Sequence, residues 1–152
     1  MLYNTATRIA QLQVDVLKTI DDASNSSLTL IGKWGFDGSS GYSEYKQRSE
    51  NNFEDNNLFV TSYVPLKLIT KSTDEHNSIT VWKNPRPSST RFCRPIRFQF
   101  RKETSDLAIK EEKYIKDQIT NLLPSKIVLP EKILTLNIPF ILPWLMAKYV
   151  TH

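Results

Sequence analysis

The sequence predicts one domain of the α+β class. At 152 residues the chain is long enough to form one hydrophobic core. Its composition, 39% hydrophobic and 24% charged, is ordinary for a soluble globular protein. Segments with the two-residue repeat of strands alternate with segments that have the helical repeat. Three main strands followed by a helix are compatible with several α+β folds, so this order alone predicts no function.

A helix is predicted near the N-terminus, over residues 4–22. Its apolar residues recur at helical spacing: Ile9, Leu12, Val16 and Ile20. Asn4 or Thr5 can cap its start, and a run of serine and asparagine at residues 24–27 ends it.

Two long strands are predicted next. The first covers residues 28–36 and ends at Asp37, and polar residues 39–57 then form a loop. The second covers residues 58–69, and Pro65 within it indicates a sheet edge or a bulge. The residues assigned to its apolar face are Leu58, Val60, Val64, Leu66 and Leu68.

A short strand at residues 78–82 and a half-buried strand around Phe98 are predicted next. In the latter, one face carries Ile96, Phe98 and Phe100, and the other carries Arg97, Gln99 and Arg101. A helix over residues 104–123 follows and ends at Pro124, beyond which the pattern loses definition.

Several classes of site are excluded or disfavoured. The single cysteine, Cys93, excludes an internal disulfide and a zinc site built on cysteines, and it fits a reducing compartment. No phosphate-binding glycine loop or dinucleotide motif occurs, so no small-molecule cofactor is predicted. His76 and His152 stand alone in the sequence. No signal peptide and no membrane span are visible, so a secreted or membrane protein is not predicted.

Positive charge is concentrated in the second part of the chain. Residues 1–60 hold five Lys and Arg against eight Asp and Glu, whereas residues 61–152 hold fifteen against eight. Seven basic residues and no acidic residue fall between positions 83 and 102: Lys83, Arg86, Arg91, Arg94, Arg97, Arg101 and Lys102. Such a run fits either a solvated strand face or a surface that follows a phosphate backbone.

Two carboxylates are the candidates for site chemistry. Asp37 follows a predicted strand and precedes Gly38, so its carboxylate is accessible to a divalent cation such as Mg²⁺. A turn is the commoner explanation of an Asp-Gly pair. Glu103 lies where the strand around Phe98 gives way to the next helix, a position that the helix dipole also favours for an acid.

Four segments together resemble the Transib family of DNA transposases and the related vertebrate V(D)J recombination-activating recombinase. They are residues 33–44 (KWGFDGSSGYSE), 81–89 (VWKNPRPSS), 92–96 (FCRPI) and 103–106 (ETSD). Their order and approximate spacing match the segment around the family's first catalytic aspartate and the segments that follow. The resemblance spans about residues 31–123.

The resemblance implies part of an RNase H-like domain, with a three-stranded antiparallel sheet, flanking helices and incomplete C-terminal strands. It implies that Asp37 and Glu103 are catalytic and bind Mg²⁺ or Mn²⁺. Such enzymes nick DNA beside a transposon end, and the freed 3′ hydroxyl then attacks the opposite strand by in-line displacement. The implied partners are DNA and a second copy of the full-length protein, and the implied compartment is the nucleus, otherwise the cytoplasm.

The chain also departs from this family. The second aspartate and the final glutamate of the family fall after Leu123, where the chain has no aspartate. Metal binding is therefore expected to be weak, and the chain alone is expected to be inactive. The alternative is a non-catalytic module or relic that binds nucleic acid or protein.

The predicted organisation has three parts. Residues 1–27 form an N-terminal helix and linker, residues 28–123 belong to the catalytic domain, and residues 124–152 form an atypical apolar tail. When codons for Leu145, Met146 and Ala147 are read in another frame, they can encode an aspartate followed by a glycine. This pair resembles the strand that the family has in this region. A frame change between Leu123 and Leu142 is therefore hypothesised, and the tail is expected to pack poorly.

Overall fold

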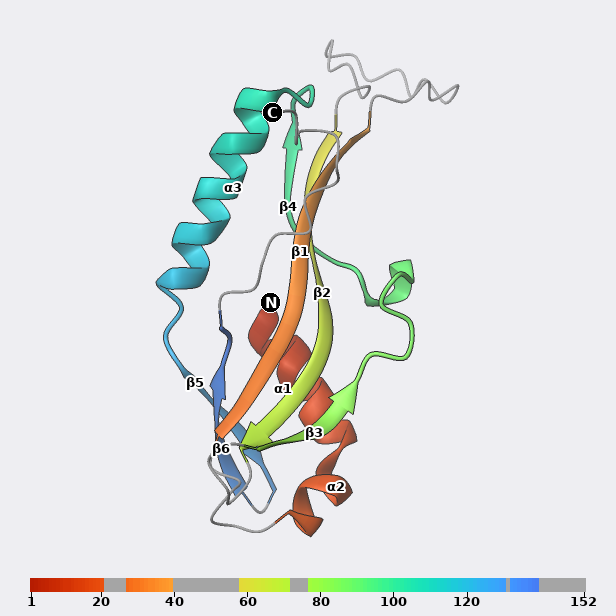
Figure 1. Cartoon of the computed structure of the whole chain (residues 1–152), viewed down its shortest axis with the longest axis vertical. Helices are drawn as coiled ribbons and strands as arrows, with labels where there is room; N and C mark the ends of the chain where they lie inside the picture. The colour runs from red at the N-terminus through yellow and green to blue at the C-terminus, as the bar shows by residue number, and fades with distance from the viewer. Residues whose placement is uncertain (21–26, 40–57, 72–76, 131, 140–152) are drawn as a thin grey trace.

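The computed structural model describes residues 1–20, 27–39, 58–71, 77–130 and 132–139. Within them the chain is a mixed α+β domain with a six-stranded sheet (Figure 1). The helices are α1 (Leu2–Leu12), α2 (Val14–Thr19) and α3 (Ser105–Thr120), with a 3-10 turn, η2, at Thr90–Phe92. The strands are β1 (Ser27–Ser39), β2 (Leu58–Lys71), β3 (Ser78–Lys83), β4 (Arg94–Phe100), β5 (Ser125–Leu129) and β6 (Lys132–Asn137). The predicted loop at residues 40–57 and the C-terminal residues 140–152 lie outside the described residues.

The sheet is mostly antiparallel. Its order is β3-β2-β1-β6-β5, and β4 also pairs with β2. All pairings are antiparallel except that of β6 with the start of β1, which is parallel. The predicted antiparallel sheet of strands centred on Leu30, Val64 and Phe98 is confirmed, because these residues lie in β1, β2 and β4.

A bulge interrupts β2 beside its proline. The register between β1 and β2 shifts between Ile31 and Gly32, and Gly32 lies opposite Pro65. Buried Asn84 compensates on the other edge: its side-chain amide donates to the carbonyl of Pro65 (2.7 Å) and its backbone N–H to that of Leu66 (2.8 Å). Proline lacks an N–H for a ladder hydrogen bond, so a bulge is where an interior strand tolerates it. The bulge predicted at Pro65 is confirmed.

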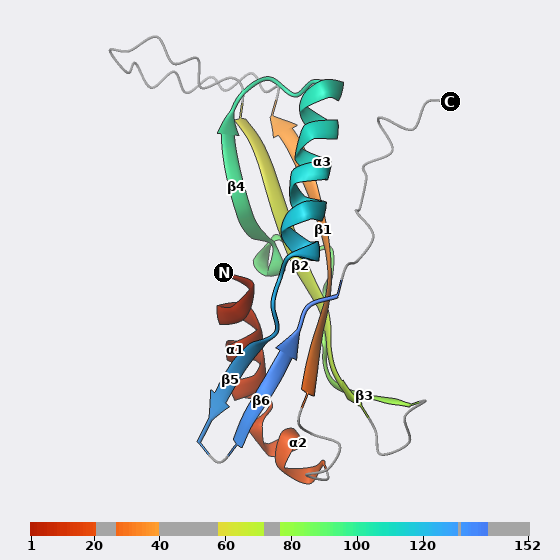
Figure 2. The ribbon, with the colours of Figure 1, turned by 90° about the vertical axis from the view of Figure 1, so that its left-hand side faces the viewer.

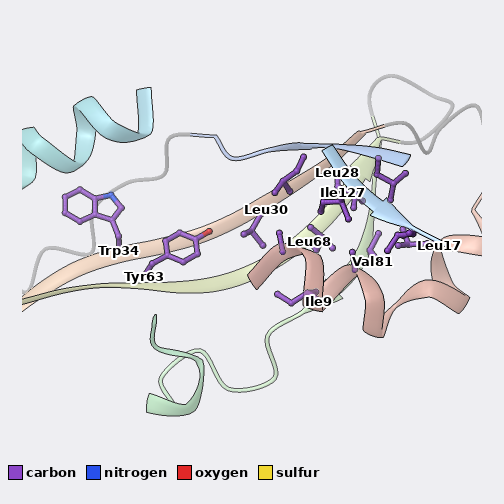
Figure 3. Packing of buried hydrophobic residues seen from close by; sticks show 14 of the residues in the cluster. Ile9, Leu17, Leu28, Leu30, Trp34, Tyr63, Leu68, Val81 and Ile127 are labelled. Carbon is purple, nitrogen blue, oxygen red and sulfur yellow. The ribbon is translucent and has the colours of Figure 1, made fainter. Parts of the chain in front are cut away.

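The hydrophobic core lies between the helices and one face of the sheet. Leu28, Leu30 and Trp34 lie at even-numbered positions of β1, so they point to the same face, where they are buried (Figure 3). Each helix contributes to the same cluster of buried residues, α1 through Ile9, α2 through Leu17 and α3 through Ile115. One face of the sheet therefore carries the helices.

Gly32 makes room for a buried tyrosine. A Cβ atom at Gly32 would lie 2.2 Å from the ring of Tyr63, so the residue at this position has to be glycine. Burial raises the pKa of the Tyr63 phenol, which keeps the side chain neutral inside the core.

The predicted N-terminal helix is two helices, separated at Gln13. The break changes which side chains face the core. Ile9 is buried as predicted, but Leu12 is 81% exposed and Val16 is also exposed, whereas Leu17 is buried. Among the described residues, no helix combines the length and the hydropathy needed to cross a membrane.

The predicted inward face is wrong for β4 and for β2 before its bulge, whereas Leu68, after the bulge, is buried as predicted. In the first half of β2 the buried residues are Phe59 and Thr61, and Val60 between them is only half-buried. In β4 Phe98 is exposed, and the polar Arg97 on the other face is half-buried. Arg97 points inward because a carboxylate on α3 receives it, as described below.

The expectation of a poorly packed tail is wrong for residues 125–137. Strands β5 and β6 form an antiparallel hairpin, and β6 extends the sheet beside β1. Four side chains of this hairpin are buried in the core: Ile127, Leu129, Leu134 and Leu136. The alternation of buried and exposed residues is therefore that of two ordinary strands, despite Pro130 between them.

Candidate functional site

Among the described residues, the buried hydrophobic cluster lies on one face of the sheet, and we call the other face the open face. It is defined by the residues that lie opposite one another in the register on this side: Lys33, Gly35 and Asp37 of β1; Leu58, Val60, Ser62 and Val64 of β2; Phe98 and Phe100 of β4. Figure 2 shows α3 running alongside β1 and β2, and in Figure 1 the segment that contains η2 lies on the opposite side of the sheet. The open face and α3 are therefore on different sides of β1 and β2.

Asp37 lies on the open face. The strand was predicted to end at Asp37-Gly38, and β1 continues one residue further to Ser39, so that Asp37 lies within the strand, opposite Val60. Its side chain is exposed and lines a hollow of about 340 Å³, together with Ser62, Thr90 and Cys93. The strand thus presents this carboxylate to solvent in a shallow depression.

Glu103 reaches β1 from the connection between β4 and α3. Its Oε2 atom accepts a hydrogen bond of 3.0 Å from the backbone N–H of Gly38, the residue after Asp37. A Cβ atom at Gly38 would lie 2.5 Å from the Cβ of Glu103, so only glycine permits this approach. Because successive residues of a strand point to opposite faces, Glu103 lies against the α3 face of β1, whereas the side chain of Asp37 lies on the open face.

Asp37 and Glu103 are the two predicted metal ligands, and their side chains lie on opposite faces of β1. Carboxylate oxygens are the ligands that Mg²⁺ and Mn²⁺ prefer, and one or two of them are usual for Mg²⁺ when phosphate and water complete the shell. Among the described residues, no group of three or more His, Cys, Asp or Glu side chains is arranged to hold a metal ion. Within the described residues, each of the two carboxylates is therefore a separate ligand for a hard divalent cation, not part of one formed donor set.

The seven basic residues predicted to contact nucleic acid fall into two groups. Five are exposed: Lys83, Arg86, Arg91, Arg101 and Lys102. The other two have structural partners. The Arg94 guanidinium donates to the carbonyls of Arg91 (2.8 Å) and Cys93 (3.3 Å), and Arg97 faces α3.

Sequence reasoning missed the most buried charged group, Glu111 of α3. Its side chain is 2% exposed and accepts three hydrogen bonds, from Thr61 (2.7 Å), Gln99 (2.7 Å) and Arg97 (3.1 Å). Arg97 also lies over the ring of Tyr114, 4.4 Å from its centroid. This network explains why the polar face of β4 points inward, because a buried carboxylate requires donors.

A signal for this network exists in the sequence, although it is weak. Position 111 falls on the same helical face as Ala108 and Ile115, both of which are buried. A glutamate on an apolar helix stripe suggests that a basic or amide side chain faces it. Nothing in the sequence identifies β4 as the strand that supplies those side chains.

Comparison with known proteins adds no relative: the sequence matches no protein-family model and no curated protein. What the chain does is therefore inferred from its residues and their arrangement.

Proposed function

We propose that this chain is part of the RNase H-like catalytic domain of a Transib-type DNA transposase, with Asp37 and Glu103 as two of its metal ligands. One observation carries the proposal: Glu103 is hydrogen-bonded to Gly38, next to Asp37, across 65 positions of sequence. The family resemblance assigns metal-binding carboxylates to the same two positions. The contact brings together two segments chosen by resemblance alone, with the side chains of Asp37 and Glu103 on opposite faces of β1.

The arrangement of the elements supports the same proposal. The resemblance implies three antiparallel strands followed by a helix, and β1, β2 and β4 are antiparallel neighbours followed by α3. The sheet then continues at β6, on the other side of β1.

The chemistry assigned to the longer protein is cleavage and joining of DNA at transposon ends, in the nucleus, by a homodimer. Two divalent ions, when bound, stabilise the attacking and leaving oxygens of an in-line displacement at phosphorus. Asp37 offers its carboxylate on the open face, and the Gly38 amide fixes one oxygen of Glu103. No aspartate follows Leu123 to serve as the family's second aspartate, so this chain alone is expected to bind DNA without cutting it.

A second candidate function is a non-catalytic DNA-binding module. It is favoured by the absence of any cluster of three potential metal ligands among the described residues, and by the five exposed basic side chains between positions 83 and 102. The two functions differ in whether Asp37 and Glu103 bind metal, so metal binding separates them.

We expect the chain to bind Mn²⁺ weakly and the variants Asp37→Asn and Glu103→Gln to lose this binding. Each variant removes the negative charge of one ligand and keeps its size. Binding is measured by electron paramagnetic resonance, from the loss of the free Mn²⁺ signal. The matched control is Asp15→Asn, an exposed carboxylate in the first turn of α2, which should leave binding unchanged. Equal Mn²⁺ binding by all four proteins would remove the metal site and leave the non-catalytic module.

We expect duplex DNA binding that is independent of sequence and falls steeply with salt. Each neutralised phosphate contributes a slope of about −0.9 to the dependence of log K on log salt concentration. Replacing Arg101 and Lys102 with alanine should therefore reduce the slope by about 2. The control replaces Lys110 and Lys113, two exposed lysines on α3, with the same change in net charge. A slope near zero for the unmodified chain, measured by fluorescence anisotropy, would contradict phosphate-driven binding.

A further inference from the structure

Two phenylalanines of β4 are exposed, and the structure explains why they face outward. Arg97 and Gln99 both donate hydrogen bonds to buried Glu111, which turns their face of β4 toward α3. Alternation along the strand then directs Phe98 and Phe100 to the open face, where they are 56% and 67% exposed. Large aromatic side chains held outward in this way on a sheet are typical of a binding surface.

The spacing of the two rings suits a nucleobase. Residues two apart on a strand project from the same face at a separation of roughly 6.8 Å, which is about two stacking distances of ~3.4 Å. A base therefore fits between the rings, or successive bases stack on each of them. Aromatic rings on a sheet are a known platform for unpaired bases, since every base presents a flat π-face.

The same face carries the proposed metal ligand. Phe98 lies opposite Val60, and Val60 lies opposite Asp37, so the three residues form one row across β4, β2 and β1. With neighbouring strands ~4.8 Å apart, the backbones of Phe98 and Asp37 are roughly 10 Å apart. A strand of DNA whose bases stack on Phe98 thus has its sugar-phosphate backbone within reach of Asp37.

Charge favours a polyanion as the occupant. Exposed Arg101 and Lys102 directly follow Phe100, and Lys33 shares the open face. Asp37 is the acidic residue among the described positions of this face, and its charge is compensated in the proposed function by a divalent cation. An apolar protein partner would account for the phenylalanines but leave the adjacent basic pair without a role.

We propose that the open face binds an unpaired DNA strand, with bases stacked on Phe98 and Phe100 and phosphates held by Arg101 and Lys102. This inference rests on the proposed function and deepens it by naming the form of DNA. In a duplex each base is stacked between its neighbours, so no base face is free to stack on Phe98 or Phe100. The chain should therefore prefer a single strand over a duplex of the same length.

The test compares three probes and two ring variants by fluorescence anisotropy at low salt. The probes are oligo(dT) of ~15 nucleotides, within the usual range of site sizes, an abasic oligomer of equal length, and the corresponding duplex. Replacing both phenylalanines with leucine keeps an apolar surface and removes the rings, whereas replacing both with tyrosine keeps the rings. We expect oligo(dT) affinity to fall about 5- to 100-fold in the leucine pair and to survive in the tyrosine pair.

The outcomes separate this inference from the proposed function. The abasic oligomer should bind weakly and equally to all three proteins, since only phosphate contacts remain. If the leucine pair binds oligo(dT) like the unmodified chain, stacking is absent and the inference is overturned, while salt-dependent DNA binding can still stand. If the chain binds none of the probes, both this inference and the proposed DNA binding are contradicted. The inference is also overturned if the open face proves to be the interface of a dimer that the leucine pair dissociates without changing oligo(dT) affinity.

Discussion

Replacing Glu111 with alanine should lower the free energy of unfolding by about 2–4 kcal/mol. The change leaves three donors without their acceptor: the hydroxyl of Thr61, the amide of Gln99 and the guanidinium of Arg97. Removing one partner of a fully buried ion pair costs about 3–5 kcal/mol. We expect a somewhat smaller value because the side chain of Arg97 is 39% exposed and water can reach it.

The control for this prediction lies one position further along the same helix. Glu112 forms a partly exposed ion pair with Lys116, one turn away on α3. Such surface pairs contribute about 0.3–0.5 kcal/mol, so Glu112→Ala should be almost neutral. Urea unfolding followed by circular dichroism measures both variants. Equal midpoints for Glu111→Ala and Glu112→Ala would show that the network does not hold β4 against α3.

The same network marks a limit of what the sequence reveals. The alternation of Phe98 and Phe100 with Arg97 and Gln99 was enough to predict a strand. The usual rule, which places apolar residues inside, then assigned the wrong face. The orientation is fixed by Glu111, a residue from the next element, because a buried carboxylate without donors costs more than two exposed phenylalanines. Local patterning does not contain that information.

The assignment of Asp37 and Glu103 as site residues stays a prediction, and their positions in the structure could not be predicted from the sequence. Asp37 and Glu103 were chosen from resemblance, and both lie at β1. Their connection depends on Gly38, whose lack of a side chain admits Glu103. A glycine after an aspartate is also what a turn requires, so the sequence did not distinguish a turn from a close approach inside a strand.

Interruptions of a regular repeat account for the wrong burial predictions in the N-terminal helix and in β2. Gln13 separates α1 from α2, so a continuous helical repeat wrongly assigned Leu12 to the core. In β2 the buried positions are odd-numbered from Phe59 to Pro65 and even-numbered at Leu68 and Thr70, because a bulge intervenes. Pro65 was enough to predict an edge or a bulge. The prediction nevertheless placed the same alternating residues on the apolar face both before and after Pro65.

Replacing Leu134 with alanine should destabilise the domain by about 2–5 kcal/mol, the usual cost of truncating a fully buried leucine. Leu134 is 0% exposed in β6, the strand that pairs with β1. Its neighbours in the core cluster include Leu28 of β1 and Ile127 of β5. A loss of this size requires that residues 125–137 unfold together with the rest of the sheet, as one cooperative unit.

Ile133 provides the matched control, because it is the adjacent residue of the same strand and is 64% exposed. Ile133→Ala should change the free energy of unfolding by less than about 0.5 kcal/mol, as is usual for exposed positions. Urea unfolding should therefore shift the midpoint for Leu134→Ala and not for Ile133→Ala. If neither variant shifts the midpoint, β5 and β6 are not part of the cooperative core, and residues 125–137 are poorly packed, as the sequence predicted. A large shift for Leu134→Ala alone assigns the hairpin to the domain, because only a register with Leu134 inside and Ile133 outside separates two such similar neighbours.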